Sequence, residues 1–385
     1  MKPNTVGSYG GWLDRLQSGG PGALSLRRGR WPSLAGWRRV ARARVLRDMA
    51  CPATGPAPKV RVTALEQCDG LHIEHLTWRL PFGPPTEALF LKPAGARGRL
   101  PAVLALHCHG GIKALGWRKI ARGRSPGPAH LMAHRPGYYD GTFWANELAH
   151  RGYAVLAHDV FPFASRGVRV RDVIHRVQAG APAQEPRTAA AVGRYNQWAG
   201  GHEHVMAKAL FNAGTTWPGV VFAEDRVALD LLCARKDVDP RRVGCGGLSG
   251  GGLRTVLLAG LDDRIRAAVC AGFMTTWRDL ATAKCWTHAW MSHIPLLPAV
   301  LDFPEILGLR APLPALVLST RQDDLFTLGE MRRADRMLRE IWRKAGAPHA
   351  YRTTFRPGPH QFNRPMQRQA FAFFDRWLGR KTSPT

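Results

Sequence analysis

Three side chains that together can perform nucleophilic catalysis occur in the order Ser249, Asp323, His360. A serine hydroxyl is a weak nucleophile unless a base accepts its proton, and the base needs an acid that fixes its orientation. Each of the three residues follows a run typical of a β-strand, so all three are expected at one edge of a sheet. The combination predicts a serine nucleophile, a histidine base and an aspartate partner.

Ser249 has the local sequence of a sharp turn between a strand and a helix. The motif Gly247-x-Ser249-x-Gly251 follows the apolar run 242–245 and precedes a helical pattern over 251–261. A side chain on such a turn comes close to neighbouring backbone, which favours flanking glycines, and the helix N-terminus behind it favours negative charge. We therefore expect Ser249 to be the nucleophile.

The candidate acid and base follow later strands. Asp323 and Asp324 come after the predicted strand 315–319, and His360 comes after the predicted strand 351–355. We expect Asp323 to be the acid, because it lies two residues before an apolar pair that leads into the next helix. Asp324 remains the alternative; otherwise its side chain would face solvent or cap the turn.

Acyl transfer also needs hydrogen-bond donors for the oxyanion. The segment Leu106-His107-Cys108-His109-Gly110-Gly111 follows the predicted strand 103–107, and its small residues allow an amide to turn toward a carbonyl oxygen. We expect the backbone N–H groups of His109 and Gly250 to form the oxyanion hole. One such donor typically contributes about 3 kcal/mol of transition-state stabilisation.

The histidines of this region allow a metal site as an alternative. His107-x-His109 would place two imidazoles on one face of a strand, and His202-Glu203-His204 offers two more. A hydrolytic metal site needs a third ligand in a fixed geometry, and neither a His-Glu-x-x-His motif nor a carboxylate partner is evident. We therefore expect no metal and no cofactor, with His107 packed in the core.

Strands and helices alternate along most of the chain. Strands are expected at 60–65, 71–80, 87–91, 103–107, 153–159, 242–245, 267–270, 315–319 and 351–355, and helices at 143–151, 223–235, 251–261, 328–345 and 364–378. Turn sequences join the first three strands, which indicates antiparallel pairing, whereas the later alternation indicates parallel strands. The fold class predicted is α/β, with a mostly parallel mixed sheet, helices on both faces and antiparallel N-terminal strands.

The chain divides into an extension and one large domain. Residues 1–58 are expected to form an N-terminal extension, with little order before residue 30 and a basic helix after Ser33. Residues 59–380 are expected to form the α/β domain. Two segments within it, about 164–222 and 275–313, exceed the usual length of connections and are candidate lids or walls of a binding site.

The composition is strongly basic. The 385 residues include 55 Lys and Arg against 28 Asp and Glu, a net charge of +27, and only 10 of these cations are lysine. Such an excess of arginine is typical of biased codon usage, which we favour over nucleic-acid binding. The seven cysteines form no CxxC pair, and neither an apolar signal nor a transmembrane run is evident, so a cytoplasmic protein with reduced thiols is expected.

Two basic segments are local candidates for anion binding. The run from Arg27 to Arg47 contains eight arginines and no acidic residue. A second group follows the expected oxyanion segment and comprises Lys113, Arg118, Lys119, Arg122 and Arg124. Either group could hold a phosphate or a carboxylate; the more common alternative is a solvent-exposed basic surface.

These motifs together resemble the α/β-hydrolase superfamily, and within it the dienelactone-hydrolase and acetyl-xylan-esterase-like branch. The resemblance covers about residues 60–380 and includes the run Asp302-Phe-Pro-Glu305-Ile-Leu before Ala311. It implies the α/β-hydrolase fold, with lid insertions, and metal-free ester hydrolysis through an acyl-enzyme. Dienelactone hydrolases proper use a cysteine nucleophile, whereas this chain has Ser249, so no particular substrate carries over.

We expect a serine hydrolase of carboxylic esters. Trp277, Trp286 and Trp290 suit stacking on sugar rings, which makes acyl esters of carbohydrates candidate substrates, with core packing as the alternative for each tryptophan. A lactone or dienelactone-type hydrolase, an acyltransferase or a peptidase could use the same triad. A different class of function is a protein that binds an anionic polymer through its basic N-terminal region. Neither a nucleic acid nor a membrane is the partner we favour.

Overall fold

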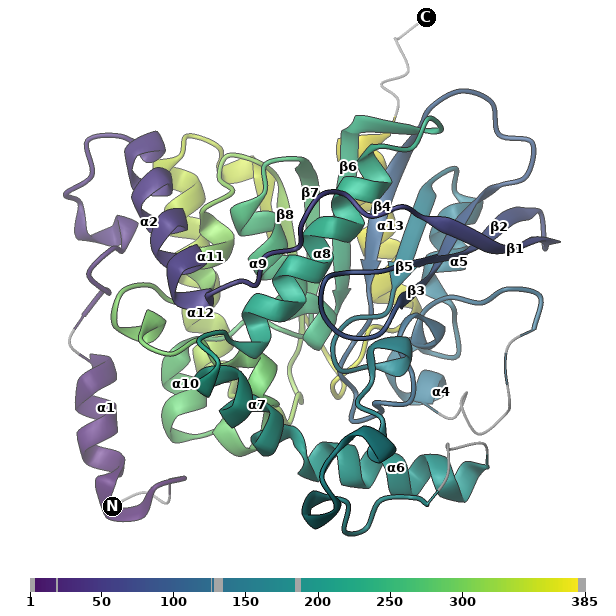
Figure 1. Ribbon diagram of the computed structural model, residues 1–385. Coiled ribbons are helices and arrows are strands. Elements are labelled where there is room, and N and C mark those ends of the chain that lie inside the picture. Colours follow the sequence, from purple (N-terminus) through teal and green to yellow (C-terminus); the bar gives the residue numbers. More distant parts are fainter. Residues whose placement is uncertain (1–3, 19, 126, 128–133, 184–187, 380–385) are drawn as a thin grey trace, which may run out of the picture.

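The computed structural model describes residues 4–18, 20–125, 127, 134–183 and 188–379. These residues form a sheet of nine strands in the order β1-β2-β3-β5-β4-β6-β7-β8-β9 (Figure 1). The strands are β1 (Arg61–Cys68), β2 (Leu71–Trp78), β3 (Thr86–Pro93), β4 (Leu100–Leu106), β5 (Ala154–His158), β6 (Val238–Leu248), β7 (Ile265–Ala271), β8 (Ala315–Thr320) and β9 (Tyr351–Arg356). The pairs β1–β2, β2–β3 and β3–β5 are antiparallel, and all later pairs are parallel.

Helices cover both faces of this sheet. One face packs against α8 (Trp217–Cys233), α9 (Gly250–Leu261), α11 (Phe303–Gly308) and α12 (Leu328–Lys344), of which α8 and α9 lie in front in Figure 1. The other face packs against α5 (Trp144–His150) and α13 (Arg364–Leu378). The predicted α/β fold with a mostly parallel mixed sheet is therefore confirmed.

Helix α8 begins earlier than its sequence pattern indicates. It starts at Trp217, inside the predicted insertion 164–222, rather than at residue 223. The Thr216 hydroxyl accepts a hydrogen bond from the Gly219 N–H, and Pro218 occupies the first turn, where its missing N–H has no cost. The first insertion therefore ends at this cap.

The two insertions follow the carboxyl ends of β5 and β7, which places them on the lower side of Figure 1. The first contains α6 (Ala189–Gly201) and α7 (Glu203–Asn212), and the second contains α10 (Trp277–Thr282) and leads into α11. Short 3-10 turns precede α6 and lie between α10 and α11. Both insertions thus lie at the edge of the sheet where catalytic loops of parallel-sheet proteins gather.

The N-terminal segment is ordered over more of its length than its composition indicates. Helix α1 (Gly10–Ser18) contacts α10, and Arg278 of α10 lies 2.9 Å from the Asp14 carboxylate of α1. The expectation of little order before residue 30 is therefore wrong for the described part. Helix α2 (Leu34–Met49) buries Trp37, Ala41, Val45 and Met49 completely within the main core.

Part of the basic surface of α2 is paired with carboxylates. Two guanidinium nitrogens of Arg42 lie 2.8 and 2.6 Å from the oxygens of Asp263, and Arg44 lies 2.6 Å from Asp48. Asp48 directly follows the arginine-rich run. These pairs attach the helix to its own C-terminal turn and to the domain.

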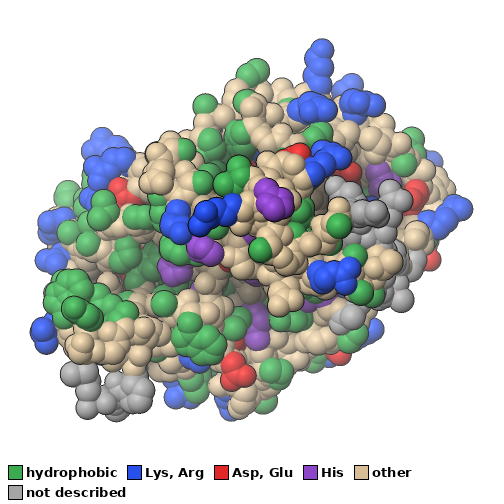
Figure 2. All heavy atoms as spheres, turned by 60° about the horizontal axis from the view of Figure 1, so that its bottom comes forward, with side chains coloured by type: hydrophobic (Ala, Val, Ile, Leu, Met, Phe, Trp, Pro, Cys, Tyr) green, Lys and Arg blue, Asp and Glu red, His purple; other side chains and the backbone are tan. Residues whose placement is uncertain are grey.

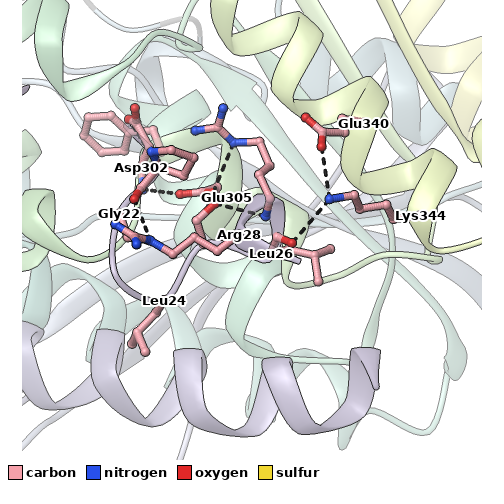
Figure 3. A network of polar contacts seen from close by, with 12 residues as sticks. Gly22, Leu24, Leu26, Arg28, Asp302, Glu305, Glu340 and Lys344 are labelled. Carbon is pink, nitrogen blue, oxygen red and sulfur yellow. Dashed lines mark hydrogen bonds and ion pairs between the residues drawn. The ribbon is translucent and has the colours of Figure 1, made fainter. Parts of the chain in front are cut away.

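A buried polar network fastens the chain before α2 to α11 and α12 (Figure 3). One Glu305 carboxylate oxygen accepts hydrogen bonds from the Ser25 hydroxyl and the Arg27 guanidinium. The Lys344 ammonium donates to the Leu26 carbonyl at 3.4 Å. Burial raises the pKa of Glu305, and the Ser25 and Arg27 donors oppose that rise. Glu305 therefore holds the extension in place, and its carboxylate is occupied by these contacts.

No helix among the described residues is long and apolar enough to span a lipid bilayer.

The packing of α2 predicts the effect of truncating its core side chain. Trp37→Ala should lower the free energy of unfolding by about 3–5 kcal/mol, because it leaves a cavity in a fully buried site. Val40→Ala on the same helix is the matched control: Val40 is 40% exposed, so a loss below about 1 kcal/mol is expected. Urea denaturation of both variants measures the difference. If Trp37→Ala lowered the free energy of unfolding no more than Val40→Ala does, the core packing of Trp37 would be contradicted.

Candidate active site

Ser249 lies on a strained turn between β6 and α9. Its backbone has φ 59° and ψ −118°, a conformation that residues with a side chain rarely adopt. A Cβ atom at either Gly247 or Gly251 would lie 2.1 Å from the Leu106 carbonyl oxygen at the end of β4. Glycine is therefore required on both sides of Ser249, because the turn is pressed against the neighbouring strand.

Asp323 and His360 lie in contact on the loops after β8 and β9. The His360 Nδ1 atom is 2.7 Å from the Asp323 Oδ2 atom, and the other carboxylate oxygen accepts the Leu325 N–H at 3.0 Å. Asp323 is only 5% exposed. Asp324 is exposed, and its main-chain carbonyl accepts a hydrogen bond from the Lys284 ammonium at 2.6 Å. Of the two aspartates, only Asp323 is placed to orient His360.

Ser249 and His360 line the same cavity, which has a volume of about 240 Å³. Gly250 and His109 also line it, so the four candidate residues from three separate loops meet there. The Nε2 atom of His360 is buried and has no hydrogen-bond partner among the described residues. Since Asp323 occupies Nδ1, Nε2 is the atom that can exchange a proton with a group in the cavity.

The two predicted oxyanion donors lie next to each other. A Cβ atom at Gly250 would be 2.8 Å from the backbone nitrogen of His109. Gly250 is the first residue of α9, so its N–H belongs to the unpaired first turn of that helix. The arrangement places both N–H groups beside Ser249, where donors to an oxyanion are needed.

The His109 side chain is held by the first insertion. Its Nδ1 accepts the Gly111 N–H at 3.1 Å, and its Nε2 lies 2.7 Å from a Glu203 carboxylate oxygen. The Lys113 ammonium donates to the same Glu203 oxygen and lies 2.6 Å from the same Nε2 atom. Burial and this ammonium lower the pKa of His109 to about 4, so the ring is neutral at pH 7.

Two cations after the oxyanion segment are buried. Lys113 and Lys119 are each 1% exposed, and their ammonium groups contact Glu203 and main-chain carbonyls. Of the other cations, Arg118 pairs with Glu87 at 3.8 Å and Arg122 with Asp69. The solvent-exposed loop offered as one alternative is therefore wrong for the two lysines, whose donors are already used within the protein.

The second insertion provides one wall of the cavity. Thr287, His288 and Met291 line it from this insertion, and Leu253 and Phe273 add apolar surface from the domain. The described part of the first insertion contributes no residue to this wall and reaches the site through Glu203. On this face of the molecule, histidines emerge near the middle, and Lys and Arg side chains form separate groups (Figure 2).

The three tryptophans of the second insertion have different environments. Trp277 is buried against Phe303, with ring centroids 3.7 Å apart, so it is a core residue. Trp290 is half-buried. Trp286 is 74% exposed and directly precedes Thr287 of the cavity wall. Of the three, Trp286 is the most exposed.

The histidines considered as metal ligands are separated by their contacts. His107 is buried with Nδ1 near the Cys108 carbonyl at 3.0 Å, and His109 bonds Glu203. His202 stacks on Trp198 at 4.9 Å, and His204 is exposed. Within the described ranges, no group of three His, Cys, Asp or Glu side chains is arranged to hold a metal.

Sequence reasoning did not find the contacts of Glu203 and Lys119, nor the position of Tyr138 in the cavity wall. Glu203 appeared only within the histidine pair of the metal alternative, and Lys119 only within a basic run. Their partners are 94 and 10 residues away along the chain. No local pattern reports a contact of that kind, so only the fold reveals it.

Comparisons with known proteins concern the fold of the chain. The model of the Prolyl oligopeptidase family matches residues 206–381. YtaP of Bacillus subtilis (strain 168), named as a candidate hydrolase, is 26% identical over 320 residues, which are 83% of this chain and 92% of YtaP.

Two solved structures show the same architecture. A candidate acetyl xylan esterase of Bacteroides fragilis NCTC 9343 has a TM-score of 0.68 at 18% identity, covering 91% of this chain and 82% of its own. A glucuronoyl esterase of Solibacter usitatus has a TM-score of 0.63 at 17% identity, and the match covers 93% of this chain and 98% of the esterase. The protein has the α/β-hydrolase fold. The fold resemblance expected from the sequence is thereby confirmed.

The crowding at Ser249 predicts a position-specific effect of adding one methyl group. Gly251→Ala should lower the free energy of unfolding by about 1–3 kcal/mol, because its Cβ meets the Leu106 carbonyl. Gly193→Ala, in α6 with no atom within 4 Å of the new Cβ, should instead stabilise by up to about 1 kcal/mol. Thermal and urea unfolding compare the pair. A neutral Gly251→Ala would contradict the close contact.

Proposed function

We propose that the protein is a serine hydrolase that cleaves carboxylic esters through an acyl-enzyme. The observation that supports this most directly is the position of His360. Its Nδ1 atom is bound to Asp323 at 2.7 Å, and its buried, unpartnered Nε2 atom belongs to a ring that lines one cavity with Ser249. This is the arrangement in which an imidazole accepts the proton of an attacking hydroxyl.

In the proposed reaction, the Ser249 hydroxyl attacks the ester carbonyl carbon while His360 Nε2 accepts its proton. Asp323 keeps the imidazole in the tautomer with the proton on Nδ1 and stabilises the imidazolium. The imidazolium then protonates the departing alcohol, which leaves the acyl group on Ser249. Water, deprotonated by His360, attacks the acyl-enzyme and releases the acid and the free serine.

The backbone N–H groups of His109 and Gly250 are the proposed donors to the oxyanion. Both lie beside Ser249, and both belong to backbone that cannot shift freely because Gly250 is packed against His109. Donors that are fixed before the reaction stabilise the developing charge without reorganising. This is the role expected from the sequence for both residues.

The cavity favours a small acyl group. Its volume of about 240 Å³ is below the roughly 300–1,000 Å³ of pockets that enclose whole ligands. Leu253, Phe273 and Met291 make its wall apolar. We infer that the acyl group enters the cavity and that the alcohol part of the substrate lies at its rim.

An acyl ester of a carbohydrate fits this division. Trp286 directly precedes Thr287 of the cavity wall and has an exposed ring, and aromatic side chains stack on the apolar faces of sugar rings. The similar structures include one named as a candidate acetyl xylan esterase. The proposed substrate class is therefore a short-chain acyl ester of a sugar.

A peptidase is the second candidate. The Prolyl oligopeptidase family model spans residues 206–381 and so includes Ser249, Asp323 and His360. Peptide hydrolysis would use the same triad and oxyanion donors. Parallel assays with an acetylated sugar and with proline-containing peptide amides separate the two activities.

Removal of the proposed nucleophile tests the mechanism. Ser249→Ala should lower kcat on a chromogenic short-chain ester by at least about 10³-fold, and Asp323→Asn by about 10³–10⁴-fold. Asp324→Asn is the matched control, with kcat within about twofold because its side chain is exposed. Steady-state hydrolysis measures all three. Unchanged activity in Ser249→Ala would falsify the assignment, and a larger loss in Asp324→Asn would transfer the acid role.

A substitution of the exposed Trp286 tests the proposed substrate class. Trp286→Ala should raise KM for an acetylated oligosaccharide about 5- to 20-fold, which corresponds to the loss of about 1–2 kcal/mol of stacking. KM for an aryl acetate should stay within about twofold. Trp12→Ala, on α1 and 53% exposed, is the control and should change neither value. An equal loss on both substrates would argue against a sugar contact at Trp286.

A further inference from the structure

Lys119 lies beneath the oxyanion segment and is almost completely buried. Its ammonium donates hydrogen bonds to the carbonyl oxygens of Cys108 at 2.9 Å and His109 at 2.8 Å. It also lies 4.3 Å from the centre of the Phe163 ring, which forms a cation–π contact. The His107 ring adds a second contact to the Cys108 carbonyl at 3.0 Å. These contacts orient the two peptide groups on either side of His109.

The direction of these carbonyls determines the direction of the catalytic N–H. In a trans peptide the carbonyl and the N–H of the same plane point in opposite directions, and the Cys108–His109 bond is not among the cis bonds. Because the Cys108 carbonyl points toward Lys119, the His109 N–H points away from it. A Cβ atom added to Gly250 would lie only 2.8 Å from the His109 nitrogen. Gly250 and His109 both line the cavity.

We propose that Lys119 is a positioning residue of the oxyanion hole, which turns the His109 N–H toward the reacting carbonyl by holding the Cys108 and His109 carbonyls. This inference rests on the proposed hydrolase function and adds the residue that prepares its transition-state donor. Lys119 touches no substrate, and its effect passes through the two peptide planes.

The segment around His109 needs a residue that fixes its peptide planes, because it is rich in glycine. Gly110 and Gly111 follow His109 with φ angles of 56° and 68°, a region that glycine enters easily and leaves easily. Without a donor beneath them, the preceding peptides could rotate at small cost. A lysine suits the task, since its long flexible stem delivers several donors to one buried point.

Lys119 can hold both carbonyls whether its amine is protonated or neutral. Burial lowers the pKa of Lys119 to about 7. The ammonium has three N–H bonds and the neutral amine has two, which suffices for two carbonyls. Hydrogen-bond geometry, rather than the charge, is therefore the basis of the positioning.

The side chain and main chain of His109 have separate anchors. Glu203 and Gly111 hold its ring, whereas Lys119 holds its carbonyl. Loss of Lys119 should therefore leave the segment attached through the ring and mainly misalign the N–H. The expected effect is on the transition state rather than on substrate binding.

The test compares Lys119→Met, which removes the donors, with Lys119→Gln, which keeps a shorter neutral donor. Lys344→Met is the matched control, because Lys344 also donates to a main-chain carbonyl but lies far along the chain, at α12. End-point labelling with a fluorophosphonate counts the active sites, and kcat is expressed per labelled site. A short alkyl boronic acid, whose tetrahedral adduct places an oxygen in the oxyanion hole, reports transition-state complementarity.

For Lys119→Met we expect kcat per site to fall about 10- to 100-fold, near the range for loss of one oxyanion donor. KM should stay within about threefold, and the inhibition constant of the boronic acid should rise in parallel with the fall in kcat. Lys119→Gln should be intermediate, and Lys344→Met should match the wild type. If Lys119→Met does not fold, Lys119→Gln alone must show the same split between kcat and KM.

The proposal is overturned if kcat per site stays within about twofold of wild type, if the loss appears in KM, or if boronate affinity is unchanged. These outcomes differ from failure of the proposed function. If wild-type hydrolysis does not depend on Ser249, the hydrolase assignment fails first. If it does depend on Ser249 but not on Lys119, only the positioning role is wrong.

Discussion

The site depends on the close contact between the turn at Ser249 and the end of β4. The Leu106 carbonyl oxygen occupies the space that a side chain at Gly247 or Gly251 would need, and the His109 nitrogen occupies the space next to Gly250. This close packing brings Ser249, the proposed nucleophile, next to Gly250 and His109, the proposed oxyanion donors. Interiors are close-packed and adjust little, so any atom added here must displace either the nucleophile or the donor.

Two hydrogen bonds explain why the strained backbone of Ser249 persists. Its N–H donates to the Ala271 carbonyl at 2.8 Å, and its own carbonyl accepts the Leu253 N–H at 2.9 Å. The N–H and the carbonyl of Ser249 are thus both paired in the unusual conformation. Strain of about 1–3 kcal/mol is tolerated when the surroundings fix a residue in this way.

Several of the cations lie inside the protein rather than on its surface. Arg254 is buried and contacts Asp225 at 2.6 Å, and Arg166 is buried against Glu224. Arg310 is also buried and donates to three main-chain carbonyls at 3.0–3.2 Å. Arginine suits such positions because its donors form a fixed planar fork. These three arginines are therefore structural and do not contribute to a basic surface.

The sequence predicted the parts of the site that have local signals. A glycine pattern around Ser249 reports a crowded turn, and the strand runs before Asp323 and His360 report a shared sheet edge. The start of α8 was misplaced because its cap, Thr216 with Pro218, lies within residues that also fit a loop. Helix α1 was missed because its nine residues form a stable helix only through contact with α10.

The contacts around His109 had no local signal of any kind. A lysine in a basic run normally reaches solvent, and burying its ammonium costs several kcal/mol unless partners are supplied. For Lys113 the partner is Glu203, which comes from an insertion 90 residues further along the chain. For Lys119 the partners are carbonyls, which every residue has. Such interactions depend on the assembled fold, and no residue pattern encodes them.

The two insertions contact the candidate site in different ways. The second lines the cavity with Thr287, His288 and Met291. The first supplies Glu203, whose carboxylate holds the His109 ring and the Lys113 ammonium. Burial raises the pKa of Glu203, but His109 and Lys113 lower it by more. The Glu203 carboxylate is therefore ionised at neutral pH. An insertion that contributes no described residue to the cavity wall thus holds the segment on which the proposed oxyanion donor His109 lies.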